Sequence, residues 1–458
     1  MNILITIALI IIGVLLFELI IFSHELGHFI TAKLSGVKVN EFALGMGPKI
    51  FGFTKGETQY SLRLFPIGGY CAMEGEDDES PEPRAFTNAK VWKRMIIIIA
   101  GAVMNIILGF LLMFVYTVQS DSYASTTIDG FVPNSYSANC GLQAGDKIIN
   151  INGYSIWNYQ DLSFAIATLS CKEVDGTTFE VYKEDAAVAA YNTYVNVVKD
   201  YNLNDEKSAE LYDVVQDGCS KINMSTAQKD AEQYLHETVS DIYGYVGKTD
   251  FEYPEITQQT QRKRFTGNVT VIRNGNEIKL DDVQFFTYYQ TQEDKENDKP
   301  SVAIDFYVEE IPKTFGSVLS QTLTQTGSMV KTVWTSLVWL VQGRFSFSDL
   351  SGPVGIASAV TQVAAQGLSV NFGAAVNNIL YVMILITVNL GIVNMLPFPA
   401  LDGGRFVFLL TEGIFKKPVP RKAEAIVNAV GLVLLMMLMV VITFKDIWQL
   451  ITGTMPGM

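Results

Sequence analysis

The stretch Ser23-His-Glu-Leu-Gly-His-Phe29 lies at the C-terminal end of the first long apolar run of the chain. On a helix, His24 and His28 lie one turn apart, about 6 Å along the axis, on nearly the same face. Two neutral imidazoles so placed can hold one zinc ion, and Glu25, turned by about 100° from His24, can act as general base toward an attacking water. Ionisable side chains are costly inside an apolar span and usually mark function. The pattern predicts a catalytic metal site; the alternative is that these side chains extend to the lipid headgroups.

The composition indicates a membrane protein that carries an acidic soluble domain. Hydrophobic residues make up 49% of the 458 positions and charged residues only 17%. Residues 120–312 hold 32 acidic and 15 basic residues, a net charge of −17; since the whole chain carries −14, the remainder carries +3. Nucleic acid is therefore excluded as a favoured partner, whereas the apolar remainder requires membrane lipid.

Four apolar segments are long enough to cross a membrane, so we expect a polytopic α-helical membrane protein with about four transmembrane helices. Their expected limits are 3–22 with a more polar continuation to 34, 95–118, 378–396 with a continuation to 410, and 425–444. The expected domains are an N-terminal membrane half (1–119), the acidic domain (120–312), interfacial amphipathic helices (313–372) and a C-terminal membrane half (373–458). Trp334 and Trp339 suit the interfacial position.

The distribution of basic residues predicts the orientation of a multi-pass protein. Lysine and arginine gather in residues 33–94 and 405–422, which lie between the first two spans and between the last two. By the positive-inside rule, both segments are cytoplasmic. The termini and the acidic domain are then extracytoplasmic, and the histidine pair lies near the cytoplasmic face.

The loop between the first two spans predicts a β-hairpin. Residues 57–65 alternate well enough for a strand, with Gly45 and Gly47 before them and Gly68 and Gly69 after them. Glycine at this density lets one backbone approach another closely, as it does beside a ligand. We expect a membrane-associated β-hairpin on the cytoplasmic side; an ordinary surface hairpin is the alternative.

The acidic domain opens with residues 129–153, which resemble a PDZ domain. Gly141-Leu142 is followed by Ala144-Gly-Asp-Lys-Ile-Ile149 as turn and strand, and Asn152-Gly153 forms a tight turn. A helix is expected over 159–169, and two strands flanking an Asn274-Gly275 turn are expected over 267–280. Residues 172–265 interrupt the pattern as an insertion, expected to be helical with loops. We expect an extracytoplasmic α+β PDZ-like domain that carries this insertion.

A third metal ligand is predicted within Asn394-Met-Leu-Pro-Phe-Pro-Ala-Leu-Asp-Gly-Gly-Arg405. Asp402 is the one carboxylate embedded in this apolar stretch. The prolines cannot continue a helix, and broken backbone at membrane depth is tolerated only around a protein-lined or water-filled cavity. His24, His28 and Asp402 with one water would make an open, four-coordinate catalytic site. A helix cap near the interface is the alternative for Asp402.

Together these motifs resemble the bacterial site-2 proteases, the zinc intramembrane proteases of regulated intramembrane proteolysis. The resemblance covers nearly the whole chain: residues 24–28, the Gly68-Gly69 loop, a PDZ-like domain between the second and third spans, Ser351-Gly-Pro-Val-Gly355, and residues 394–404. It implies that His24, His28 and Asp402 bind one zinc ion and that Glu25 is the catalytic base.

The resemblance also implies how the substrate is bound. Asn394 would hold the substrate backbone, and the hairpin before Gly68 and Gly69 would pair with substrate. An edge strand over residues 60–64, which includes Leu62 and Leu64, could receive an unwound transmembrane segment by strand addition. Family substrates are transmembrane segments of pre-trimmed single-span proteins in the bacterial cell membrane, either membrane-bound anti-sigma factors or remnant signal peptides. The chain departs from the family pattern in its insertion and in showing one PDZ domain where some relatives have two in tandem.

Two other classes of function are alternatives for this sequence. A non-catalytic metal-binding membrane scaffold would keep His24, His28 and Asp402 but would not need Glu25. A transporter or metal channel would spread polar residues along several spans and show an internal repeat, whereas here they gather at one depth. Neither the physiological substrate nor the oligomeric state follows from the sequence.

Overall fold

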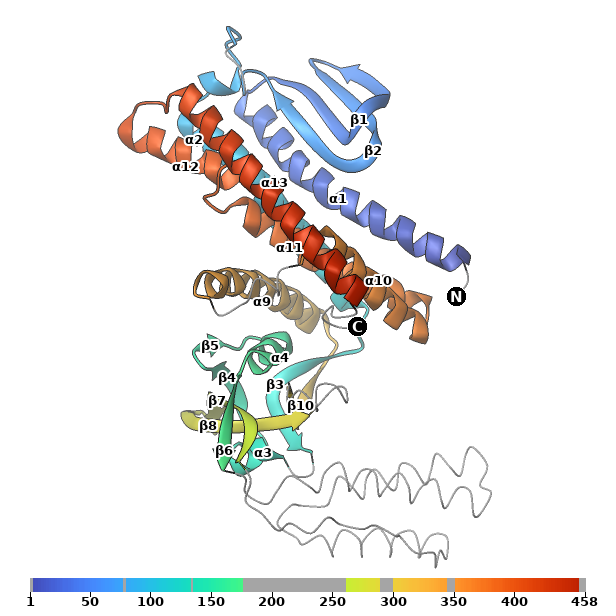
Figure 1. Cartoon of the computed structure of the whole chain (residues 1–458), viewed down its shortest axis with the longest axis vertical. Coiled ribbons are helices and arrows are strands. Elements are labelled where there is room, and N and C mark those ends of the chain that lie inside the picture. The colour runs from blue at the N-terminus through green and yellow to red at the C-terminus, as the bar shows by residue number, and fades with distance from the viewer. Residues whose placement is uncertain are drawn as a thin grey trace, which may run out of the picture. The chain divides into compact units, whose positions relative to one another are not determined.

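A computed structural model describes residues 3–76, 80–132, 135–175, 261–288, 300–343 and 351–452. The chain divides into two compact units: the first joins Met1–Asp121 to Lys313–Met458, and the second is Ser122–Pro312. The first unit is mainly helical and the second mainly β (Figure 1). The second unit therefore corresponds to the acidic domain expected over residues 120–312.

Within the described residues, four helices are long and apolar enough to cross a membrane, as the sequence predicts. They are α1 (Ile3–Ser35), α2 (Val91–Val118), α11 (Phe372–Asn394) and α13 (Arg421–Thr452). α11 begins at Phe372 rather than at 378, because the side chain of Asn371 caps its first turn by accepting a hydrogen bond from the Ala374 N–H. A shorter helix, α12 (Asp402–Phe415), follows a break in the chain after α11.

Small residues bring α1 and α11 close to α2. A Cβ on Gly27 of α1 would lie 2.3 Å from the carbonyl oxygen of Ala100, and a Cβ on Gly391 of α11 would lie 2.9 Å from that of Ala102. Contacts of this kind let helix backbones approach one another in a membrane. The middle of α2 is therefore in contact with both α1, which carries the histidine pair, and α11.

Two more helices precede α11. α9 (Phe315–Val341) starts with a capping box between Thr314 and Ser317, and α10 (Pro353–Val370) starts with a proline after Gly352. Neither is among the four helices apolar enough to span a membrane in the described part of the chain. Their interfacial position stays a prediction.

The first turn of α10 is capped by a residue from a distant helix. The buried Asp446 of α13 accepts hydrogen bonds from the backbone N–H groups of Gly352 and Gly355, at 2.9 and 2.8 Å. A Cβ on either glycine would lie 3.0 Å from the Asp446 Oδ2. This carboxylate thus explains both glycines of the Ser351–Gly355 motif.

The loop between α1 and α2 forms a sheet of two long strands, β1 (Val39–Lys55) and β2 (Thr58–Met73). Each strand bends, so that the two pair with each other more than once. Leu44 lies opposite both Leu62 and Gly69, and Leu62 lies opposite both Leu44 and Phe51. The order across the sheet is therefore 69–73, 39–44, 58–63 and 49–55.

The prediction of an edge strand at residues 60–64 is wrong, because Tyr60, Ser61 and Leu62 are each paired on both sides. Among the described residues, the register gives a neighbour on only one side for segments 49–55 and 69–73. These two segments are the open edges of the sheet.

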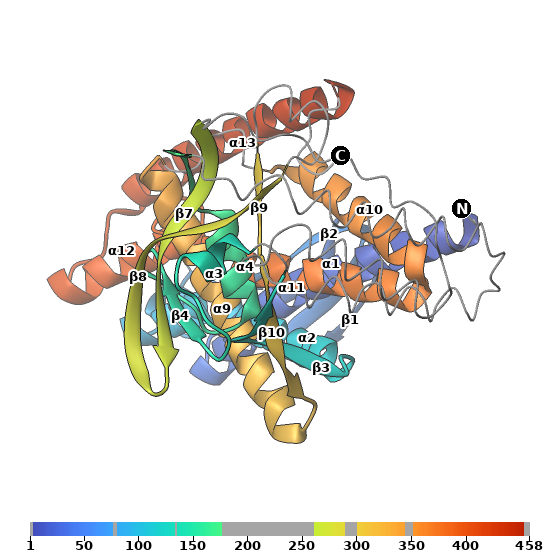
Figure 2. The ribbon, with the colours of Figure 1, turned by 90° about the horizontal axis from the view of Figure 1, so that it is seen from below.

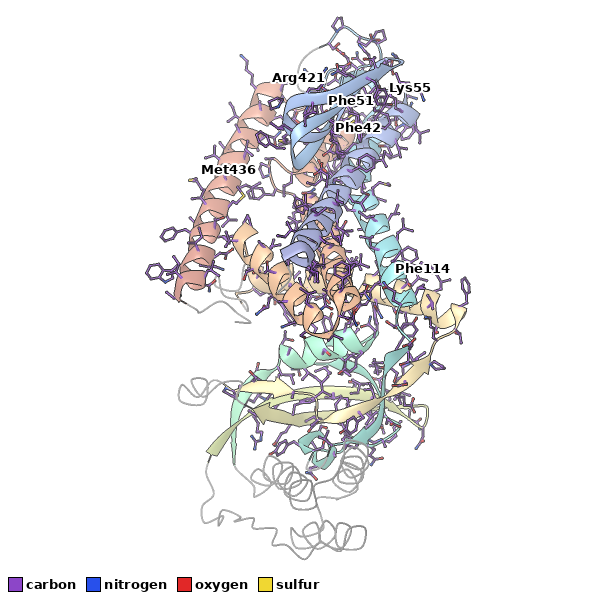
Figure 3. All side chains as sticks on the ribbon, turned by 90° about the vertical axis from the view of Figure 1, so that its right-hand side faces the viewer. Phe42, Phe51, Lys55, Phe114, Arg421 and Met436 are labelled. Carbon is purple, nitrogen blue, oxygen red and sulfur yellow. The ribbon has the colours of Figure 1, made fainter. Side chains whose placement is uncertain are left out.

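Side chains of the sheet form a polar network at one place and an apolar surface at another. Glu41, Arg63 and Tyr70, from three neighbouring segments, are joined through the Arg63 guanidinium. Phe42 packs on Phe22 and Phe29 of α1, whereas Phe51 is 62% exposed (Figure 3). The other exposed apolar side chains of the sheet are Met46, Ile50, Phe53, Leu62, Leu64 and Phe65.

The second unit is a sheet of eight described strands with the helices α3 (Tyr136–Asn139) and α4 (Tyr159–Ala167). Six strands follow the order β10–β3–β4–β7–β8–β9, while β5 pairs with β4 and β6 pairs with β7. Their limits are β3 (Ser122–Phe131), β4 (Lys147–Ile151), β5 (Tyr154–Ser155), β6 (Ser170–Asp175), β7 (Gln261–Arg273), β8 (Asn276–Tyr288), β9 (Ser301–Ala303) and β10 (Phe306–Pro312).

Several local predictions for this unit are confirmed. α4 is the helix expected over 159–169, and β7 and β8 form the expected hairpin (Figure 2). Asn274 and Gly275 both have positive φ, 51° and 79°, as a two-residue hairpin turn requires. The arrangement is α+β; the PDZ resemblance itself stays a prediction.

The insertion begins later and ends earlier than predicted. β6 and β7 pair from Ser170 opposite Thr266 to Asp175 opposite Gln261. Residues 172–175 and 261–265 are therefore strand, and the helical prediction for them is wrong, because this pairing joins positions too far apart in sequence to show in a local pattern. The chain leaves the sheet after Asp175 and returns to it at Gln261, which lies opposite Asp175. Residues 176–260 lie outside the described residues.

Candidate metal centre

The two histidines of α1 lie side by side, as their spacing predicts. Their rings are 4.8 Å apart between centroids, and the two Nε2 atoms are 3.2 Å apart. Each residue is only 8% exposed. Burial of two imidazoles with facing nitrogens is the arrangement that a metal ion stabilises.

Asp402 reaches the imidazoles because the helix breaks before it. α11 ends at Asn394, and α12 begins with Asp402 in its first turn. A Cβ on Gly403 would lie 2.1 Å from the carbonyl oxygen of Leu396, and one on Gly404 would lie 2.4 Å from that of Phe398. The two glycines therefore let the connecting turn fold back against the start of α12. The predicted break in the third apolar segment is confirmed.

The three side chains fit a tetrahedral zinc ion. Asp402 Oδ2 lies 3.2 Å from His24 Nε2 and 3.5 Å from His28 Nε2. Zinc bonds of about 2.0–2.1 Å at tetrahedral angles place ligand atoms about 3.3 Å apart. Oδ2 is buried, and its polar neighbours are these two nitrogens. The triangle of ligand atoms is of the right size, and three protein ligands leave a fourth position for water or substrate.

α2 forms a wall of this site that the sequence analysis missed. A Cβ on Gly101 would lie 2.4 Å from His28 Nε2 and 2.7 Å from His24 Cε1, so only glycine leaves room for the imidazoles. His28 Nδ1 lies 2.8 Å from the carbonyl oxygen of Ile97 and donates to it in the tautomer whose Nε2 can bind a metal. A glycine inside a long apolar helix is the sequence signal that points to such a contact.

Glu25 contacts the open edge 69–73 of the sheet. A Cβ on Gly69 would lie 3.4 Å from Glu25 Cγ, so the backbone of this edge lies next to the Glu25 side chain. Among the described residues, the cluster of potential metal ligands consists of His24, His28 and Asp402 without Glu25. Glu25 is therefore placed next to the cluster and outside it.

The other predicted substrate-binding residues lie outside the ligand cluster of the described chain. Leu62 and Leu64 are exposed on the sheet, Gly68 takes a positive φ of 93° beside Met46, and Asn394 ends α11. Of the hairpin residues, the structure brings Gly69 next to Glu25.

Two ion pairs tie α12 to the rest of the first unit. Glu412 accepts a hydrogen bond from Arg94 of α2 at 2.5 Å, and both side chains are largely buried. Arg405 pairs with Glu76, in the loop after β2. Arg405 and Glu412 lie seven residues, about two turns, apart, so they face nearly the same way. Two ion pairs on one face of α12 therefore hold this helix against α2 and against the loop after β2.

The fold and the site define a class of protein. Apolar spanning helices, a buried His-His-Asp cluster and a glutamate directly after the first histidine are the parts of a membrane-embedded metalloprotease. Residues 12–438 match the profile of peptidase family M50. The chain belongs to this family, the site-2 proteases, and is a zinc metalloprotease.

Relatives match the chain over nearly its full length. It is 33% identical over 439 residues to a protein of Clostridium acetobutylicum, covering 96% of this chain and 97% of the relative. It is 30% identical over 452 residues to the zinc metalloprotease RasP of Bacillus licheniformis (95% and 98% covered). It is 28% identical over 456 residues to the regulator of sigma-W protease RasP of Bacillus subtilis (95% and 97% covered). The family resemblance and the zinc cofactor predicted from the sequence are confirmed.

Proposed function

We propose that this protease cuts within the transmembrane segments of single-span membrane proteins whose outer domains have already been trimmed. His24, His28 and Asp402 hold one zinc ion, and Glu25 is the general base. The observation that carries the proposal is the ligand triangle, with edges of 3.2, 3.2 and 3.5 Å, on a helix apolar enough to span a membrane.

Zinc, when bound, acts as a Lewis acid that polarises the scissile carbonyl and makes water a stronger nucleophile. Glu25 takes the proton from the attacking water and passes it to the leaving amine nitrogen. Asn394 donates its amide N–H to the substrate backbone or to the oxyanion that develops.

A peptide bond in a transmembrane helix must leave the helix before it can be attacked, and its backbone groups then need partners. The open edge 69–73 supplies them by strand addition, because it has a paired strand on only one side and its Gly69 lies next to Glu25. Gly68 and Gly69 keep this edge free of side chains that would hold a substrate strand away. Leu62, which lies on an inner segment, and Leu64, two residues further on, contribute an apolar surface.

The orientation that the basic residues favour places the site near the cytoplasmic face and the second unit outside the cell. The exposed apolar side chains of the β1–β2 sheet support its association with the membrane. A relative is named as the protease that regulates sigma-W. We therefore propose anti-sigma-factor-like membrane proteins as substrates of this chain. Remnant signal peptides, which are also apolar membrane-spanning segments, are a second proposed group of substrates.

The test is cleavage of a pre-trimmed transmembrane substrate by the purified, detergent-solubilised protein. Wild type, Glu25→Gln, the exposed control Glu277→Gln on β8, and a chelated sample are compared, with zinc content measured on each. Wild type and Glu277→Gln should cleave; Glu25→Gln should keep its zinc and cleave at least about 100-fold more slowly. Cleavage that persists in Glu25→Gln would end this mechanism. A metal-binding scaffold without catalysis would instead hold zinc and cleave nothing in any sample, with any substrate offered.

A further inference from the structure

We propose that Asn105 of α2 is a positioning residue for His24, which holds the imidazole in the tautomer that binds metal. The inference rests on the proposed metal centre and assigns a role in it to a residue that neither binds the metal nor touches substrate. It follows from three features: a stripe of α2 that faces the imidazoles, the donor and acceptor needs of His24, and the complete burial of Asn105.

Three positions of α2 face the histidine pair at intervals of four residues. The Ile97 carbonyl oxygen lies 2.8 Å from His28 Nδ1, and Gly101 lies against both rings. Asn105 lies one turn further, with its Nδ2 at 3.4 Å from His24 Nδ1. Positions four apart share a helix face, so one stripe of α2 contacts both imidazoles: Ile97 and Asn105 lie at their Nδ1 atoms, and Gly101 lies between, next to His28 Nε2.

The facing Nε2 atoms fix which proton His24 must carry. A neutral imidazole that binds metal through Nε2 has its proton on Nδ1, and that N–H needs an acceptor. His28 finds one in the Ile97 carbonyl. For His24, the amide oxygen of Asn105 is the acceptor at hand, because Oδ1 is buried and has no other hydrogen-bond partner. Turning the amide by 180° about its last side-chain bond brings Oδ1 to the place of Nδ2, where it can accept the His24 Nδ1–H.

Burial and the packing of α11 restrict the position of Asn105. It is 0% exposed in the middle of an apolar helix, where an unpaired amide destabilises the fold. The hydroxyl of Thr387 of α11, a residue also 0% exposed, donates a hydrogen bond to the backbone carbonyl oxygen of Asn105 at 3.2 Å. A Cβ on Gly391 of α11 would lie 3.4 Å from the Asn105 Cβ. α11 therefore packs against this residue from one side while His24 lies near its amide.

The two histidines thus differ in a testable way. The partner of His28 is a backbone carbonyl, which side-chain substitution leaves in place. The partner of His24 is a side chain, which can be exchanged. Asn105→Leu removes the acceptor at similar volume, and Asn105→Asp keeps an oxygen acceptor for the Nδ1–H. Thr117→Val is the matched control, because it removes another buried polar side chain of α2, three turns further along the helix and bonded to Thr322.

The experiment measures zinc affinity of the full-length, detergent-solubilised variants by competition with a chelator, together with the visible absorption of the cobalt-substituted proteins and the thermal midpoints. Asn105→Leu should bind zinc about 10- to 100-fold more weakly and shift the cobalt bands. Asn105→Asp should bind zinc with an affinity within a few-fold of wild type. Thr117→Val should match wild type in zinc affinity and in the cobalt spectrum.

Three results would overturn the proposal. Equal zinc affinity and equal cobalt spectra in wild type and Asn105→Leu would show that the amide positions nothing. Equal losses in Asn105→Leu and Asn105→Asp would show that packing matters and the acceptor does not. Absence of zinc from wild type would overturn the metal centre itself, and the positioning role with it. Cleavage is not part of the readout, so a failure of the protease proposal is recognised separately.

Discussion

The two sides of the metal centre are built by different means. His24 and His28 stand on one uninterrupted helix, so their separation follows from the helical period alone. Asp402 stands at the start of a helix that follows a broken segment, and its position depends on Gly403, Gly404 and the ion pairs of α12. The comparison teaches that one half of the site is fixed locally, and that the other half is fixed by contacts between distant parts of the chain.

Gly101→Ala should break the histidine side most completely. The new Cβ would lie 2.4 Å from a ligand nitrogen, in helix backbone that has little freedom to move. We expect zinc affinity to fall by more than about 100-fold, measured by chelator competition. Gly109→Ala on the same helix is the control: its Cβ would meet Val388 Cγ2 at 2.7 Å, which costs about 1–3 kcal/mol of stability and leaves zinc bound. A Gly101→Ala protein with full zinc content would contradict the described geometry.

Gly403→Ala should break the aspartate side. Its Cβ would overlap the Leu396 carbonyl oxygen, so the turn must shift and carry Asp402 with it. A displacement of about 1 Å costs on the order of 100-fold in kcat/KM, measured with the transmembrane substrate. Zinc should remain bound through the two histidines, more weakly than in wild type. Gly413→Ala lies in the same helix with only an ordinary contact of 3.7 Å to Val91, and it should retain full activity. Equal activity of the two variants would mean that the turn does not position Asp402.

Glu412→Gln tests whether distant contacts hold the aspartate side. It leaves the Arg94 guanidinium, largely buried, without its counter-charge. Breaking a buried pair from one side typically costs about 3 kcal/mol of unfolding free energy. The double variant Arg94→Met with Glu412→Met should recover most of that loss, which thermal unfolding would show. If the single and double variants unfold alike, the pair contributes nothing that apolar packing cannot replace.

The smallest expected effect is a pH dependence of stability at the C-terminal end of α1, the helix that carries the histidines. Hydrogen bonds from Arg84 and then from Lys33 of α1 lower the pKa of Glu57 from 4.5 to about 2. Because the folded pKa is the lower one, this contribution to stability is present above about pH 4.5 and is lost as the pH falls toward 2. The thermal midpoint of wild type should exceed that of Glu57→Gln at pH 6, and the gap should narrow below pH 4.5 and close as the pH approaches 2. A gap that stays constant over this range would exclude Glu57 as its source.

The histidine side could be predicted from the sequence, because a helix converts a spacing of four residues into a distance. The broken segment before Asp402 could be predicted as well, since prolines and paired glycines forbid a continuous helix at that point. The part of α2 could not be predicted in the same way. Ile97 contributes a backbone carbonyl, which leaves no mark in the sequence, and Gly101 indicates a close contact without indicating its partner.

The sheet shows where local patterns mislead. Alternation over residues 57–65 marks a strand but does not tell how many neighbours that strand has. Leu62 has two, because the chain bends at glycines with positive φ, Gly45 at 80° and Gly68 at 93°, and brings two further segments alongside. Pairing of this kind depends on the path of the whole loop, so the edge that contacts Glu25 is visible only in three dimensions.

The cap that Asp446 provides to α10 has a consequence for the order in which the protein is completed. α10 emerges during synthesis well before α13, so its first two free N–H donors at Gly352 and Gly355 have no carboxylate to accept them until residue 446 has been added. A nascent chain, or one truncated before Asp446, exposes two unsatisfied donors at the start of α10. The first turn of α10 can therefore be capped only after the chain has been synthesised as far as Asp446 of α13.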